Sequence, residues 1–106
     1  MKVAIIGVGL IGGSLALKLR EKKFANQFSG IDQSGEHLQE ALDLGIIDIA
    51  ENLENGVKNA DLIIVAIPVD ATVKILPQVL DLISENQTVM DVGSTKSGIV
   101  TAIKNH

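Results

Sequence analysis

Six residues near the start of the chain, Gly7-Val8-Gly9-Leu10-Ile11-Gly12, decide the fold. They follow a short, continuous apolar run at residues 3–6, and apolar residues then recur every four positions at Ile11, Leu15 and Leu19. The run, rich in Ile and Val, predicts a buried parallel strand, and the four-residue spacing predicts an amphipathic helix. A glycine turn between such a strand and helix matches the G-x-G-x-x-G pattern of dinucleotide-binding βαβ units.

Each glycine of this turn has a physical reason, and an acidic residue completes the pattern. Gly7 lets the chain turn sharply out of the strand, Gly9 lets a pyrophosphate approach the backbone, and Gly12 lets the helix pack close to the sheet. The helix that begins here presents free N–H groups to phosphates. Asp32 ends a second predicted strand about twenty residues later, where a carboxylate binds the adenosine ribose hydroxyls.

Asp32 also bears on the choice of cofactor. A carboxylate at this position repels the 2′-phosphate of NADP, and residues 33–36 contain no Arg or Lys. We therefore expect NAD rather than NADP. FAD uses the same fingerprint, but the later strand ends disfavour it.

The rest of the chain alternates between strand and helix patterns. We expect strands at about 2–6, 28–32, 47–50, 61–67 and 88–92, and helices at about 10–23, 35–44, 53–58, 70–85 and from about 96 onward. Pro77 lies inside the fourth helix and is expected to kink or divide it. This order predicts an α/β Rossmann-type doubly wound parallel sheet in a single three-layer domain over residues 1–106.

Composition narrows the classes of function. Hydrophobic residues make up 46% of the 106, and the net charge of −4 argues against a nucleic-acid partner. The basic residues Lys18, Arg20, Lys22 and Lys23 are interpreted as a solvated face at a helix end. The absence of cysteine excludes disulfides and thiolate metal sites, and we expect no metal. Without a long apolar run to span a membrane, the chain is expected to be soluble and cytoplasmic.

Two more strand ends carry candidate site residues, because ligands of open α/β sheets lie beyond the carboxyl ends of the strands. Ile67 ends the strand at 61–67 and Pro68 follows it, and both are expected to lie against the nicotinamide ribose, with Asp70 capping the next helix. Ser94 and Lys96 follow the strand at 88–92. They either point to where a substrate meets the nicotinamide, or serve as a helix cap and a solvent-facing lysine.

Four segments together resemble the nucleotide-binding part of prephenate dehydrogenase: 3–14, 30–32, 60–69 and 91–96. The combination of Gly-Leu-Ile-Gly-Gly-Ser with Asp-x-Gly-Ser-x-Lys is what distinguishes this resemblance from a likeness to dehydrogenases in general. The resemblance implies NAD-dependent oxidative decarboxylation of prephenate to 4-hydroxyphenylpyruvate, in tyrosine biosynthesis, by a homodimer. The cofactor contacts are expected at Gly7, Gly9, Leu10, Ile11, Gly12, Asp32, Ile67, Pro68 and Gly93, and the catalytic residues at Ser94 and Lys96.

The resemblance also implies what lies beyond these residues. The family's catalytic histidine belongs to a downstream His-Pro segment, and a helical second domain follows. His37, expected on a helix surface, and His106, the last residue, do not match that histidine. We therefore expect a fragment that binds NAD, does not oxidise prephenate by itself, and tends to associate through its exposed sheet edge. The alternatives are an NAD-binding regulatory domain and a related enzyme such as arogenate dehydrogenase.

Overall fold

The computed structural model describes residues 1–92 and 100–103. The strands are β1 Lys2–Ile6, β2 Gln27–Ile31, β3 Ile49–Ala50, β4 Leu62–Val65, β5 Thr88–Asp91 and β6 Val100–Ile103. The helices are α1 Leu10–Glu21, α2 Gly35–Asp43, α3 Leu53–Asn59 and α4 Val69–Leu82. None of the helices in the described ranges has the length and apolar character needed to cross a membrane.

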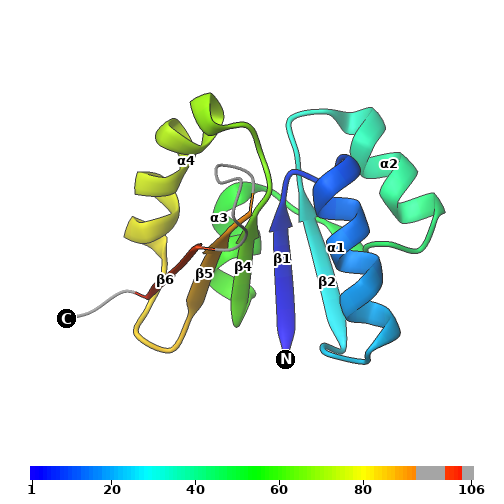
Figure 1. Cartoon of the computed structure of the whole chain (residues 1–106), viewed down its shortest axis with the longest axis horizontal. Helices are drawn as coiled ribbons and strands as arrows, with labels where there is room; N and C mark the ends of the chain where they lie inside the picture. The colour runs from blue at the N-terminus through cyan, green and yellow to red at the C-terminus, as the bar shows by residue number, and fades with distance from the viewer. Residues whose placement is uncertain (93–99, 104–106) are drawn as a thin grey trace.

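The strands form one six-stranded sheet in the order β3-β2-β1-β4-β5-β6 (Figure 1). The first five are parallel, and β6 runs antiparallel to β5. The chain moves outward from β1 to β3, then crosses back to place β4 on the other side of β1. This reversal is the topological switch point at which doubly wound sheets bind their ligands. The predicted Rossmann-type parallel sheet is confirmed.

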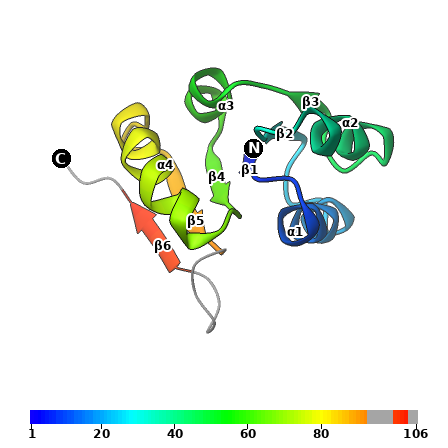
Figure 2. The ribbon, with the colours of Figure 1, turned by 90° about the horizontal axis from the view of Figure 1, so that it is seen from above.

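Helices cover both faces of the sheet, with α1 and α2 on one face and α3 and α4 on the other (Figure 2). Successive residues of β1 point to opposite faces because side chains alternate along a strand. Val3 and Ile5 pack with Phe28 under α1 and α2. Ala4 and Ile6 pack in the second core, under α3 and α4. Burial on both faces explains why β1 and β4 are continuously apolar in sequence.

The expectation of a last helix from about residue 96 is wrong over Val100–Ile103, which form the edge strand β6. Three of these four residues are β-branched, a type that favours strands. They pair with β5, Asp91 with Val100 and Thr88 with Ile103, and so cover an edge that β5 would otherwise expose. Residues 96–99 lie outside the described residues.

The fourth helix differs from expectation in two ways. It is a single helix, α4, with Pro77 inside it, so of the two expected outcomes, a kink or a division, the division into two short helices is wrong. Pro77 cannot donate to the carbonyl of Val73, but Val73 is 69% exposed, so water can reach that side of the helix. Asp70 is not the N-cap: Pro68 holds that position, and Asp70 lies in the first turn, where a negative charge complements the helix dipole.

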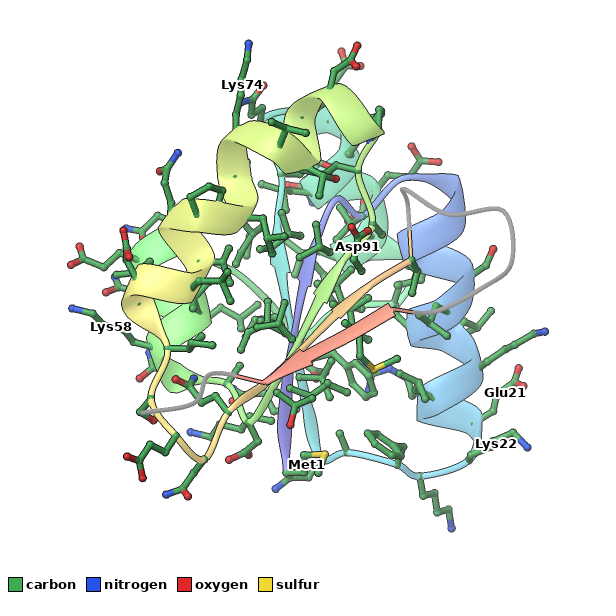
Figure 3. All side chains as sticks on the ribbon, turned by 60° about the vertical axis from the view of Figure 1, so that its left-hand side comes forward. Met1, Glu21, Lys22, Lys58, Lys74 and Asp91 are labelled. Carbon is green, nitrogen blue, oxygen red and sulfur yellow. The ribbon has the colours of Figure 1, made fainter. Side chains whose placement is uncertain are left out.

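Arg20 departs from the predicted solvated face, although Lys18, Lys22 and Lys23 are exposed (Lys22 points outward in Figure 3). Its guanidinium lies 3.0 Å from Asp48 Oδ2 and 4.7 Å from the Phe28 ring centre, and so ties α1 to the sheet. Burial alone would raise the pKa of Asp48, but the Phe28 N–H bond and the Arg20 charge together hold it below its usual value.

Candidate nucleotide-binding site

The glycine turn connects β1 to α1 and packs against the residues that follow β4. Gly7 has a φ of +93°, in the left-handed region that favours glycine. A Cβ on Gly7 would lie 2.6 Å from the Ala66 carbonyl oxygen and equally close to Ile67 Cγ2. Its N–H donates to the Ile31 carbonyl across 2.7 Å. Glycine is therefore required here both by backbone conformation and by the neighbouring strands.

The other two glycines of the motif differ in what they face. A Cβ on Gly12 would overlap the Gly7 carbonyl oxygen and lie 3.1 Å from Ile5 Cγ2, so Gly12 serves the packing of α1 on β1. A Cβ on Gly9 would meet no atom within 4 Å. Protein packing therefore does not explain Gly9. It borders open space at the start of α1, where backbone N–H groups favour an anion.

Asp32 stands directly after β2, and its carboxylate is held from two sides. Oδ2 accepts a hydrogen bond from the Val8 N–H at 3.0 Å, and Oδ1 accepts one from the Ser34 N–H at 2.8 Å. The side chain is only 13% exposed. Each carboxylate oxygen can accept a further hydrogen bond, so the two backbone donors orient the group and leave capacity for hydroxyl donors.

His37 is a neighbour of Asp32 that the sequence alone did not indicate. Its side chain is 53% exposed, which confirms the predicted surface position, but its Nδ1 lies 3.4 Å from Asp32 Oδ2. The capping of α2 brings it there, because Ser34 Oγ accepts a hydrogen bond from the His37 N–H at 3.2 Å. A Ser followed three residues later by His, next to the strand-ending Asp, is the signal from which this contact follows.

A crevice of about 400 Å³ opens where the carboxyl ends of β1, β2 and β4 meet. This edge of the sheet is the one at which Asp91 lies in Figure 3, opposite Met1. The crevice has a mixed lining: apolar side chains come from the ends of β1 and β2, from the segment after β4 and from α3 and α4, and polar ones come from the residues after β2 and β3. Among its lining residues are Gly7, Asp32, Gln33, Glu51, Asn52, Leu53, Ile67, Pro68, Ala71 and Ile75.

The structure thus brings together four of the expected cofactor contacts, Gly7, Asp32, Ile67 and Pro68, in one crevice. Gly9 lines a separate cavity of about 330 Å³ between α1 and α2. Glu51, Asn52 and Leu53 were not expected, although their position directly after the short strand β3 is a signal for them.

For the remaining expected contacts, the structure describes the backbone alone or does not describe the residue. Leu10 and Ile11 begin α1, but their side chains are not among those described. Gly93, Ser94 and Lys96 lie outside the described residues. Within residues 1–92 and 100–103, no group of three or more acidic or histidine side chains is placed to hold a metal ion.

The comparison with protein families identifies this arrangement. The model of the prephenate dehydrogenase nucleotide-binding domain matches residues 15–106. The chain belongs to the prephenate dehydrogenase family. The prephenate dehydrogenase of Bacillus subtilis is 39% identical over 100 residues, which cover 92% of the chain and 27% of that protein. The chain therefore spans about a quarter of the length of this relative.

Solved structures of the prephenate dehydrogenase family and of related enzymes agree with this assignment. A prephenate dehydrogenase from A. aeolicus, in complex with hydroxyphenyl propionate and NAD+, superposes with a TM-score of 0.80 at 35% identity, covering 88% of this chain and 33% of that one. An arogenate dehydrogenase from Synechocystis superposes with a TM-score of 0.79 at 28% identity, covering 92% and 34%. Asp32 thus lies within the part of the chain that matches the nucleotide-binding domain of this family.

Proposed function

We propose that this chain binds NAD at the carboxyl ends of β1, β2 and β4, as the cofactor half of a prephenate dehydrogenase. The observation that carries the proposal is the Asp32 carboxylate, which two backbone N–H groups hold at the rim of the crevice, beside the glycine turn. A group oriented in this way suits the paired hydroxyls of a ribose. The NAD+ complex of the A. aeolicus relative supports the same cofactor.

The residues around Asp32 fit the other parts of the dinucleotide. The open space beside Gly9, at the first turn of α1, suits the pyrophosphate. Ile67 and Pro68 share the crevice with Asp32, so we assign them to the adenosine half of the cofactor in place of the nicotinamide ribose contact expected from the sequence. NAD, when bound, supplies the hydride acceptor. The part of this chain is to bind the cofactor and to orient it.

Calorimetric titration of the chain with NAD and NADP tests the cofactor proposal. We expect NAD to bind at least about tenfold more tightly, because the Asp32 carboxylate repels a 2′-phosphate. Replacing Asp32 with Ala should lower the affinity for NAD and narrow the difference in affinity between NAD and NADP. Tighter binding of NADP than of NAD, or an unchanged ratio in the variant, would contradict the proposal.

The reaction that we propose for the whole protein is the oxidative decarboxylation of prephenate to 4-hydroxyphenylpyruvate, within a cytoplasmic homodimer. Ser94 and Lys96 match the family's motif, and we propose them as its catalytic residues on this chain, Ser94 at the substrate hydroxyl and Lys96 as a nearby positive charge. The family match favours this enzyme over a regulatory domain. Formation of NADH from prephenate, followed by absorbance and compared between the whole enzyme and its Ser94→Ala variant, measures the role of Ser94.

Arogenate is the second candidate substrate, favoured by the similarity to the Synechocystis arogenate dehydrogenase. The two enzymes share the same fold over this chain, so the nucleotide-binding domain does not discriminate between them. Rates of NADH formation with prephenate and with arogenate, measured side by side on the whole enzyme, separate the two. A faster rate with arogenate would overturn the choice of prephenate.

A further inference from the structure

Glu51 lies in the candidate site but has no role in the description above. It follows β3 directly, and its N–H donates to the Gly30 carbonyl across 2.9 Å, which continues the pairing of β2 and β3 past Ala50. This pairing holds Glu51 at the carboxyl end of the sheet, in the lining of the same crevice as Asp32. Its position is therefore set by the sheet rather than by a free loop.

The carboxylate of Glu51 is incompletely satisfied. Its Oε2 is shielded from solvent, and among the described residues it has no hydrogen-bond partner. A buried acceptor without a partner is costly, and more so when it is charged, so native proteins seldom keep one without a reason. A ligand that brings an N–H group into the crevice would supply the missing donor.

The lining of the crevice indicates what kind of ligand this is. Leu53, Ile67 and Ile75 give it an apolar part that suits the flat faces of an aromatic base. Adenine adds an exocyclic amine, a donor of two N–H groups. The neighbouring Asn52 Oδ1 already accepts a hydrogen bond from the Asn55 N–H at 2.8 Å, whereas Glu51 Oε2 has no partner among the described residues and is the acceptor in need of a donor.

We propose that Glu51 accepts a hydrogen bond from the exocyclic amine of adenine and makes the crevice selective for adenine dinucleotides. The inference rests on the proposed binding of NAD, in which Asp32 holds the adenosine ribose. The terminal torsion of a Glu side chain is broad, so a rotation of the carboxylate turns an oxygen toward a base in the crevice at little cost. Glu51 then completes its own hydrogen bonding only when the ligand is bound.

Titration of the chain with NAD and with nicotinamide hypoxanthine dinucleotide tests this role. The second compound has a carbonyl oxygen where adenine has its amine, so at the position that we assign to Glu51 it offers an acceptor in place of a donor, and its one ring donor lies at the neighbouring N1. We expect the native chain to bind NAD about tenfold more tightly than the hypoxanthine compound. In Glu51→Gln, the amide can donate to that carbonyl, and the ratio should fall to about threefold or less.

Two control variants separate the outcomes. Glu54→Gln changes an exposed residue of α3 whose carboxylate pairs with Lys58 at 3.1 Å, and should leave both affinities unchanged. Asp32→Asn should lower the affinities for both dinucleotides equally and leave the ratio of the two affinities as in the native chain. If the native chain binds both equally, or if Glu51→Gln keeps the native ratio, the role of Glu51 is overturned. If the native chain binds neither, the proposed binding of NAD itself fails.

Discussion

The carboxylate of Asp32 accepts a hydrogen bond from the backbone N–H of Val8 across 3.0 Å. This bond joins the middle of the glycine turn to the end of β2, two segments that are distant in the chain and adjacent in the sheet. Asp32 therefore has two tasks. It holds the turn in place, and it presents its remaining lone pairs to the crevice.

Asp32→Asn should impair both tasks. The variant keeps the volume of the side chain but loses a charge-assisted bond, and the stability of the chain should fall by about 1–2 kcal/mol in urea denaturation. The affinity for NAD should fall by about tenfold or more, while the affinity for NADP should fall by a smaller factor. Asp81→Asn, an exposed position on α4, serves as the control and should change neither quantity. Native stability and native affinity in Asp32→Asn would show that the bond to Val8 is incidental.

Substitutions of Gly9 and Gly12 should have different effects, the first on NAD binding and the second on the stability of the fold. Gly12→Ala places a methyl group against the Gly7 carbonyl oxygen and should destabilise the chain by about 1–3 kcal/mol. Gly9→Ala meets no atom of the protein and should leave the melting temperature nearly unchanged, yet weaken NAD by about tenfold or more as the methyl group meets the pyrophosphate.

Gly35→Ala is the matched control for both glycines, because a Cβ there also meets no atom within 4 Å and Gly35 lies away from the turn. We expect native NAD affinity and a stability within about 1 kcal/mol of the native chain. Calorimetric titration and thermal melting of the three variants make the comparison. Unchanged NAD affinity in Gly9→Ala would contradict the assignment of the pyrophosphate to the space beside Gly9.

Gln87 should be a main determinant of stability away from the site. Its buried amide donates to the carbonyls of Val57 and Ala60, at 2.6 and 2.5 Å, and so closes the end of α3. Gln87→Ala removes the side-chain donor from both carbonyls, of which the Val57 carbonyl keeps the Ala60 N–H at 3.3 Å, and should cost about 1–3 kcal/mol in urea denaturation. The exposed Gln78→Ala should stay within about 0.5 kcal/mol of the native chain. Equal effects of the two substitutions would contradict this role.

The pair of Arg20 and Asp48 should make stability depend on acid pH. Because the folded-state pKa of Asp48 is lowered, its contribution is fully present above the unfolded value of about 3.9 and is lost as the pH falls through the folded value. Asp48→Asn should therefore cost about 0.5–1 kcal/mol at neutral pH, a modest figure because the pair is partly exposed. Below the folded pKa of Asp48, the variant and the native chain should converge.

Urea denaturation of Asp48→Asn and the native chain across the acid range measures this dependence. The exposed Asp81→Asn should follow the native chain at every pH. A difference between Asp48→Asn and the native chain that persists unchanged into strong acid would show that the carboxylate charge is not responsible.

Most of the fold follows from local patterns. The continuous apolar runs at β1 and β4 predicted buried parallel strands, and the glycine turn with Asp32 predicted the βαβ unit that the structure shows. The failures lie where the surroundings in the folded chain decide the outcome. Val100–Ile103 form a strand because the edge of β5 is available to them, and Pro77 stays inside α4 because its side of the helix faces water.

The sequence by itself determined the order of strands and helices as far as β5, the glycine turn and the acid at the end of β2, because each depends on residues close together in the chain. Only the tertiary structure decided which side chains meet. Glu51 shares a crevice with Asp32 and Ile67 because a parallel sheet gathers the carboxyl ends of distant strands at one edge. Such contacts depend on register and packing, which no local pattern records.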